Sequence, residues 1–249
     1  MGRKEGKVCF MEIKVNEITE GDCLEVLRDV PNDFVDIICT SPPYGGISHK
    51  KFNKKTGKVE HYDPYKDDYP EEEYQMNQRD VLRECFRVLK DDGIMFYNHK
   101  NKIKDGISIT PYKWLKDSYF FVKQELIYVC GTALTDPIRF YPTTERIYVL
   151  AKNRKTVLNN VEKRTDILKP KRKDKYESHF HPRSFPEGLV SMLLRAVANT
   201  NSQTIVLDPY SGGGTTAMVA KKLGMKYIGI ELDKEYAEKS RERLSMYLF

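Results

Sequence analysis

The sequence lacks a long apolar run. No stretch of its 249 residues approaches the roughly 20 apolar residues that a membrane-spanning helix needs. Residues 1–5 show neither the apolar segment nor the small-residue cleavage site of a signal peptide. Low-complexity repeats are also missing, and 40% of the residues are hydrophobic, which excludes a disordered chain. We therefore expect a soluble, cytoplasmic protein with no membrane partner, built as one α/β domain over residues 1–249.

Cysteine is scarce as well. The five cysteines are odd in number, widely spaced and form no CxxC pair. A disulfide framework and a zinc site are therefore not expected, and we predict no metal. Cys39 falls in an apolar run and Cys85 on the apolar face of a predicted helix, which favours a place in the core for both.

The excess of positive charge is small and local. The 42 Lys and Arg residues against 36 Asp and Glu leave a net charge of +6, which is compatible with a nucleic-acid partner but does not require one. Basic residues gather in residues 152–182, where apolar residues are few, and we interpret this segment as a small insert rather than core. Another basic run, residues 50–55, lies in a polar stretch, residues 45–70, that predicts a surface loop.

Hydrophobic periodicity predicts alternating strands and helices. Strands are expected at residues 34–39, 94–97, 121–129, 146–151, 204–207 and 227–230. Helices are expected at residues 71–90, 111–119, 215–223 and 233–248, with Asp91-Asp92-Gly93 ending the first. Asp22 would cap a further short helix, and Ser184 with Glu187 would form a capping box for another. The order favours a doubly wound, mostly parallel sheet.

A glycine turn follows one predicted strand directly. The segment from Asp208 through Gly212-Gly213-Gly214 leads from strand into helix, and glycines let a backbone approach a ligand closely. Glu231 ends the next strand, where an acid can accept hydrogen bonds from ribose hydroxyls. The turn is neither GxGxxG nor a P-loop. These residues favour an adenosine-containing cofactor and leave NAD, FAD and S-adenosylmethionine open.

The tetrapeptide Ser41-Pro42-Pro43-Tyr44 follows a buried strand. Its two prolines make a stiff backbone whose carbonyls cannot easily turn away. A serine hydroxyl and a fixed carbonyl offer two acceptors to an exocyclic amino group, and Tyr44 offers a flat face for a planar base. On its own, the tetrapeptide also fits a strand that ends at prolines.

Together these motifs resemble the amino-methylating DNA methyltransferases, which methylate cytosine N4 or adenine N6. The resemblance rests on five segments in one order: residues 40–44, 87–93, 181–187, 208–216 and 228–233. Because the tetrapeptide precedes the glycine turn, the chain resembles the permuted β class of this family. That class implies a circularly permuted Rossmann-like fold with a seven-stranded sheet. The basic segment, residues 152–182, would then be a target-recognition insert.

The resemblance also implies roles at the catalytic tetrapeptide. Ser41 and the Pro42 carbonyl would accept hydrogen bonds from the target amino group, Pro43 would stiffen the turn, and Tyr44 would stack on the base. A base inside a duplex must be extruded before it can react. None of the five cysteines follows a proline, so methylation at cytosine C5 is disfavoured. Serine at the first position favours cytosine N4 over adenine N6.

S-adenosylmethionine is the cofactor that the resemblance implies. Asp208 and the turn after it would hold the methionine end, Glu231 the ribose, and Asp22 the adenine amino group. Ser184 and Phe185 would pack against the cofactor. The remaining cofactor-binding residues of the turn would be Pro209, Tyr210, Ser211, Gly212, Gly214, Thr215 and Thr216.

Double-stranded DNA is the partner that the resemblance implies. Phosphate contacts are expected from basic residues in both basic runs and beside the last motif. The expected DNA-binding residues are Lys50, Lys51, Lys163, Arg164, Lys171, Arg172, Lys173 and Arg183. The resemblance also allows a homodimer and a restriction endonuclease acting on the same site. Two rival readings are a nicotinamide- or flavin-dependent oxidoreductase, which leaves the tetrapeptide without a role, and a non-catalytic nucleic-acid-binding protein.

Overall fold

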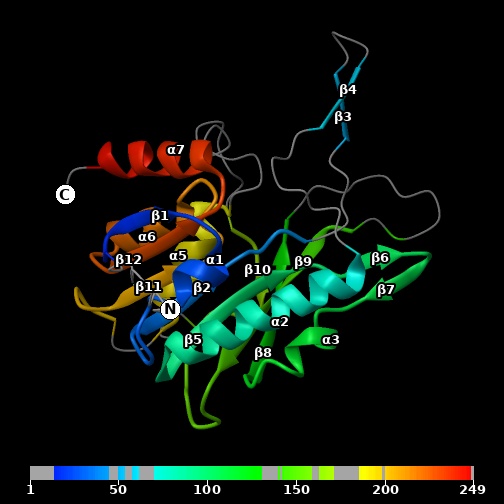
Figure 1. Cartoon of the computed structure of the whole chain (residues 1–249). Helices are drawn as coiled ribbons and strands as arrows, with labels where there is room; N and C mark the ends of the chain where they lie inside the picture. The colour runs from blue at the N-terminus through cyan, green and yellow to red at the C-terminus, as the bar shows by residue number, and fades with distance from the viewer. Residues whose placement is uncertain are drawn as a thin grey trace, which may run out of the picture.

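An eight-stranded mixed sheet forms the centre of the molecule, in the order β1-β12-β11-β2-β5-β9-β8-β10 (Figure 1). β9 runs antiparallel to its neighbours β5 and β8, and the other neighbouring strands pair in parallel. The computed structural model describes residues 14–44, 50–53, 58–61, 70–130, 140, 142–158, 163–170, 185–197 and 200–247. The strands are β1 (Glu17–Glu20), β2 (Val35–Thr40), β5 (Leu89–His99), β8 (Phe121–Val129), β9 (Thr144–Ala151), β10 (Ile167–Leu168), β11 (Ile205–Asp208) and β12 (Lys226–Glu231).

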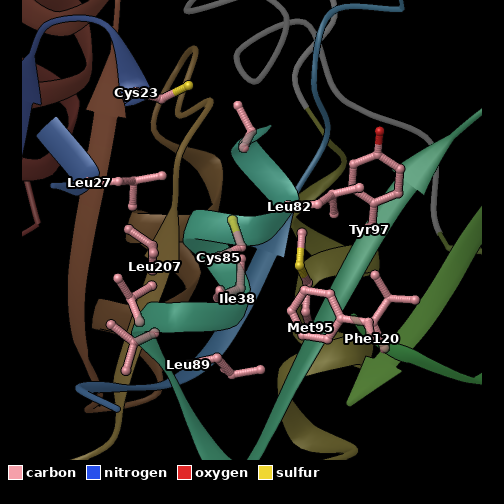
Figure 2. Packing of buried hydrophobic residues seen from close by; sticks show 14 of the residues in the cluster. Cys23, Leu27, Ile38, Leu82, Cys85, Leu89, Met95, Tyr97, Phe120 and Leu207 are labelled. Atoms are coloured by element: carbon pink, nitrogen blue, oxygen red, sulfur yellow. The ribbon is translucent and has the colours of Figure 1, made fainter. Parts of the chain in front are cut away.

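Helices cover both faces of the sheet. One core cluster joins it to α1 (Cys23–Leu27), α2 (Glu71–Val88) and α3 (Tyr112–Leu115). The other joins it to α5 (Glu187–Arg195), α6 (Thr215–Lys222) and α7 (Lys234–Ser245). Side chains alternate between the faces, so that Ile38 lies in the first cluster and Ile37 and Cys39 in the second. Figure 2 shows Cys85 of α2 beside Ile38 of β2. The predicted doubly wound, mostly parallel architecture is confirmed.

The sheet has eight strands rather than the predicted seven. Two of its strands, β1 and β10, are missing from the strands predicted by periodicity. β10 has two residues and lies within the basic segment that we expected to stay apart from the core. It pairs with β8, and Leu168 is buried in the second core cluster. The polar stretch at residues 45–70 also contains structure, because β3 (Lys50–Asn53) and β4 (Lys58–His61) form an antiparallel hairpin. A further hairpin joins β6 (Lys102–Lys104) and β7 (Ile107–Ile109).

Two predicted helix boundaries are wrong. α2 ends at Val88, and Asp91-Asp92-Gly93 lies inside β5. A Cβ at Gly93 would lie 2.9 Å from the Asp36 carbonyl oxygen, so this glycine serves a close approach of strands rather than a helix end. Ser184 of the predicted capping box lies outside the described residues, and α5 begins at Glu187 with Pro186 as its N-cap. Glu187 instead pairs with Arg243, at 2.9 Å.

No helix in the described part of the chain is long and apolar enough to cross a membrane. Among the described residues, no group of three or more His, Cys, Asp and Glu side chains is arranged to hold a metal ion. Cys39 and Cys85 are fully buried, as predicted.

Candidate active site

Polar side chains meet at one edge of the sheet. The neighbouring parallel strands β1, β12, β11, β2 and β5 all end there, since the carboxyl ends of parallel strands share an edge. In sheet order, the residues at or just after these ends are Asp22, Glu231, Asp208, Ser41 and His99. Ligands of open α/β sheets bind at this edge. The glycine turn and the catalytic tetrapeptide, far apart in sequence, therefore lie on adjacent strands.

Glu231 holds the glycine turn through the backbone. Its carboxylate is buried and accepts hydrogen bonds from the amides of Gly212 and Asp233, at 2.7 and 2.8 Å. Gly214 is the N-cap of α6 with φ of 71°, and a Cβ there would lie 3.1 Å from that of Ser240. Positive φ and close packing both favour glycine at this position.

Side chains of helix α7 hold the glycine turn through hydrogen bonds to its carbonyl oxygens. Ser240 Oγ lies 2.6 Å from the Gly212 carbonyl oxygen, and Arg243 donates to the Gly213 carbonyl oxygen at 2.8 Å. The Arg243 guanidinium is completely buried and also pairs with Glu187 of α5, at 2.9 Å. A buried cation of this kind needs its partners, so the turn, α5 and α7 are joined into one unit.

Asp208 links the two halves of the site. Its carboxylate accepts from the Thr40 hydroxyl at 2.7 Å and from the Tyr210 amide at 3.1 Å. Burial raises the pKa of Asp208 to about 6, against the lowering effect of its hydrogen bonds, and the nearby Glu231 charge raises it further. Because Thr40 directly precedes the tetrapeptide, this hydrogen bond joins the strand end that carries the tetrapeptide to the start of the glycine turn.

A cluster of hydroxyl, amide and carboxylate groups surrounds the tetrapeptide. Tyr44 donates its hydroxyl to Glu145 at 2.9 Å, and the same hydroxyl lies 3.3 Å from Ser41 Oγ. The Asn98 amide nitrogen lies 2.6 Å from the Tyr44 oxygen and 2.9 Å from Glu145 Oε2. Burial raises the pKa of Tyr44 well above its usual value, and the Glu145 charge adds to the effect. Tyr44 is therefore a neutral hydrogen-bonding group.

Tyr74 of α2 fixes the tetrapeptide from another side. Its hydroxyl lies between the Pro43 carbonyl oxygen, at 2.8 Å, and His99 Nε2, at 2.7 Å. The other ring nitrogen of His99 lies 2.6 Å from the Lys100 carbonyl oxygen, which can only accept. Burial, with Lys102 and Lys100 nearby, lowers the pKa of His99 to about 3, so the ring is neutral. A rigid group of side chains therefore holds the Pro43 carbonyl in place.

The turn suits a ligand that is positively charged and carries hydroxyl groups. Ser211 Oγ is buried and has no hydrogen-bond partner in the described part of the structure. Asp208 and Glu231 add two buried carboxylates, and a cation beside them would stabilise their ionised forms. Both observations fit a cofactor with a cationic methionine end and a ribose.

The sequence profile of the N6/N4 DNA methylase family matches residues 35–242. The chain belongs to this family. The methylase is 26% identical over 273 residues to the type II methyltransferase M.BglII of Bacillus subtilis, covering 95% of this chain and 71% of that relative.

Solved structures with the same fold include the PvuII DNA methyltransferase (cytosine-N4-specific). It superposes with a TM-score of 0.72 at 19% identity, over 93% of this chain and 89% of that one. A protein of Thermus thermophilus assigned as a DNA modification methylase, complexed with S-adenosyl-L-methionine, gives a TM-score of 0.62. Its identity is 25%, over 92% of this chain and 95% of that one.

Not every predicted site residue of the methylase falls in this cluster. Asp22 caps α1, accepting from the Leu24 amide at 2.8 Å. Phe185 is half-buried against the second core cluster, and Ser184 lies outside the described residues. Thr216 of α6 donates to the Cys39 carbonyl oxygen at 3.2 Å. Pro209 to Gly214 lie between β11 and α6, and Thr215 is the first residue of α6.

The predicted DNA-binding residues are dispersed. Lys50 and Lys51 lie on β3 of the β3–β4 hairpin, and Lys163 and Arg164 are exposed shortly before β10. The remaining four lie outside the described residues: Lys171, Arg172, Lys173 and Arg183.

Several site residues of the methylase escaped sequence reasoning. Glu145 is the second residue of β9, which runs antiparallel to its neighbours and therefore brings its amino end to the edge of the candidate site. Asn98 and His99 end β5 two residues beyond the predicted strand. In the sequence, Tyr74 looks like an ordinary residue on a helix face, and Arg243 looks like one more charged residue on an exposed helix. The sequence offers only a weak signal for such residues, namely that they are polar and lie at strand ends next to an expected site.

Proposed function

We propose that this chain transfers the methyl group of S-adenosylmethionine to the exocyclic amino group of a base in double-stranded DNA, and that the base is cytosine, methylated at N4. The observation that carries the proposal is the hydrogen bond of 2.7 Å between Thr40 and Asp208. It makes the acceptor site at the tetrapeptide continuous with the cofactor turn, and transfer between two bound molecules requires that proximity.

The cofactor would supply a methyl group activated on a cationic sulfur. Asp208 and Ser211 would bind its methionine end, and Glu231 would bind the ribose while it keeps the turn in shape. Burial that raises the pKa of Asp208 supports this assignment, because a cationic ligand relieves the cost of ionising that carboxylate.

The target amino group would donate hydrogen bonds to Ser41 and to the Pro42 carbonyl. The Tyr44 ring would stack on the extruded base, with its hydroxyl anchored to Glu145 at 2.9 Å. Serine at the first tetrapeptide position supports cytosine. The alternative is adenine N6, since the family includes enzymes for both bases.

The basic segments would contact DNA phosphates, with residues 152–182 as the recognition insert. The exposed Lys163 and Arg164 support this placement. We also propose a role in a restriction-modification system, in which an endonuclease acts on the same DNA site.

The test is methyl transfer from labelled S-adenosylmethionine to DNA of mixed sequence, followed by digestion to nucleosides. We expect labelled N4-methylcytosine, and loss of the label in the variant Ser41→Ala. Labelled N6-methyladenine would instead support the alternative base. DNA binding without transfer to any sequence would contradict the proposal and favour a non-catalytic nucleic-acid-binding protein.

A further inference from the structure

Glu145 places a carboxylate beside the catalytic tetrapeptide. It lies near the start of the antiparallel strand β9 and is brought next to Asn98 of β5 by the pairing of these strands. Glu145 Oε2 lies 2.9 Å from both the Tyr44 hydroxyl and the Asn98 amide nitrogen. A carboxylate at this point accepts hydrogen bonds, and it can also accept a proton.

The hydroxyls of Ser41 and Tyr44 form a path to this carboxylate. Ser41 Oγ lies 3.3 Å from the Tyr44 oxygen, which in turn lies 2.9 Å from Glu145. Asn98 Nδ2 lies 2.6 Å from the Tyr44 oxygen and 3.3 Å from Ser41 Oγ, so its two N–H groups lie beside the path and can donate to its members. Each hydroxyl both donates and accepts, which is what proton transfer along such a path requires.

The proposed reaction leaves a proton to be removed. The amino nitrogen forms a bond to the methyl carbon while the sulfur–methyl bond breaks with its electron pair on sulfur. The nitrogen then carries a positive charge and one proton too many. Among the described residues beside the path, Lys100 and Arg146 are cations and the His99 ring nitrogens already contact Tyr74 and Lys100, so these side chains are poor proton acceptors.

Resting on the proposed function, we infer that Glu145 receives the proton released by the methylated amino group, through Ser41 and Tyr44. The amino nitrogen gives its proton to Ser41 Oγ as the Ser41 proton passes to the Tyr44 oxygen and the Tyr44 proton passes to Glu145. The balance is a neutral methylamino group and a protonated Glu145, which later releases its proton to water. Glu145 therefore acts through Tyr44 and does not touch the base.

Single-turnover methyl transfer at saturating cofactor and DNA tests this inference in the full chain. Glu145→Gln keeps the shape and removes the basic oxygen, so we expect transfer to slow at least about tenfold. Cofactor and DNA affinities should stay within about twofold of wild type. The double variant Tyr44→Phe/Glu145→Gln should be no slower than the slower single variant, because both substitutions break one path. The control Glu125→Gln removes a nearby carboxylate that pairs with Arg146 instead, and it should leave the transfer rate unchanged.

Rescue separates a proton acceptor from a merely structural group. In Glu145→Ala, added acetate should restore transfer severalfold, whereas acetamide, which has the same shape and little basicity, should not. Equal rescue by acetamide, or a wild-type rate in Glu145→Gln, would overturn the inference while leaving the proposed function intact. If the wild-type chain transfers no methyl group to any DNA, the proposed function itself fails.

Discussion

The two halves of the candidate active site are held by different kinds of contact: contacts to backbone groups in one half and contacts between side chains in the other. On the cofactor side, the turn after β11 is held through its own backbone, by Glu231 on the Gly212 amide and by Arg243 on the Gly213 carbonyl. On the base side, side chains hold one another: Tyr44 with Glu145, and Tyr74 with His99. The first arrangement fixes a path of the main chain, and the second fixes the positions of individual polar atoms.

Because of this difference, we expect substitutions in one half to affect cofactor binding and substitutions in the other half to affect the rate of methyl transfer. A backbone cradle accommodates any ligand with the right charge and shape, so damage to it should appear as lost cofactor affinity and lost stability. A side-chain cluster aligns reacting atoms, so damage to it should appear in the transfer rate. Three substitutions test this division.

The largest effect is expected for Arg243→Met. Removing the guanidinium deprives the Gly213 carbonyl and the Thr215 hydroxyl of a buried donor and leaves Glu187 with Lys222 alone. Breaking a buried pair costs up to about 3–5 kcal/mol of unfolding free energy. Urea unfolding and calorimetric titration with S-adenosylmethionine should show lower stability and at least tenfold weaker binding.

The control is Arg241→Met on the same helix. Arg241 donates to the Ile18 carbonyl oxygen at 2.9 Å, on β1 rather than on the turn. Its loss should cost about 1 kcal/mol and leave cofactor affinity unchanged. Wild-type affinity in folded Arg243→Met would show that α7 does not support the turn.

A smaller effect, of opposite sign, is expected for Asp208→Asn. Burial raises the pKa of Asp208 to about 6, above the ordinary 3.8. The protonated form therefore favours folding below pH 4, and this contribution is lost as the pH rises through 6. The variant avoids that loss, so above pH 7 its unfolding free energy should exceed the wild-type value by up to about 3 kcal/mol, while its cofactor affinity falls.

Thermal unfolding from pH 4 to pH 8 measures this prediction. The gain should grow between pH 4 and 6 and then level off. Asp36→Asn is the control, because Asp36 lies at the opposite edge of the sheet and pairs with Lys90 at 2.6 Å; it should give no gain at any pH. A constant advantage of Asp208→Asn at every pH would refute the explanation by ionisation.

The smallest effect on stability is expected for Tyr74→Phe. Losing the hydroxyl removes a donor shared by Pro43 and His99, at a cost of about 1–2 kcal/mol. Because the tetrapeptide loses a fixed contact, methyl transfer should slow about tenfold while cofactor affinity stays within twofold. The control Tyr112→Phe removes an exposed hydroxyl that donates to Glu125 at 3.2 Å, and it should change neither quantity. If Tyr74→Phe weakened cofactor binding as much as transfer, the two halves would not be separable.

Sequence reasoning predicted more of the residues that gather at the proposed cofactor half than of those at the proposed base half. Asp208, the glycines and Glu231 lie at the ends of consecutive strands, so one local pattern of strand, turn and helix predicted them together. The tetrapeptide was found for the same reason. Glu145 and Tyr74 were not, because they reach the site through an antiparallel strand and a helix face whose positions depend on the whole fold.

Local sequence patterns also gave wrong predictions where the same pattern is compatible with two different local structures. Asp91-Asp92-Gly93 has the composition of a helix end, yet Gly93 is required by its contact with Asp36. Ser184 and Glu187 have the spacing of a capping box, yet Glu187 neutralises Arg243. Both true partners lie far away in sequence, where no periodicity predicts them.

The support that α7 gives to the glycine turn bears on when the molecule becomes competent during its synthesis. The catalytic tetrapeptide leaves the ribosome about 200 residues before Arg243, which at roughly 5–20 residues per second is tens of seconds earlier. Until then, the Gly213 carbonyl lacks its buried donor, and Glu187 has only Lys222 as a cationic partner. A nascent chain therefore completes the tetrapeptide well before α7 can support the glycine turn.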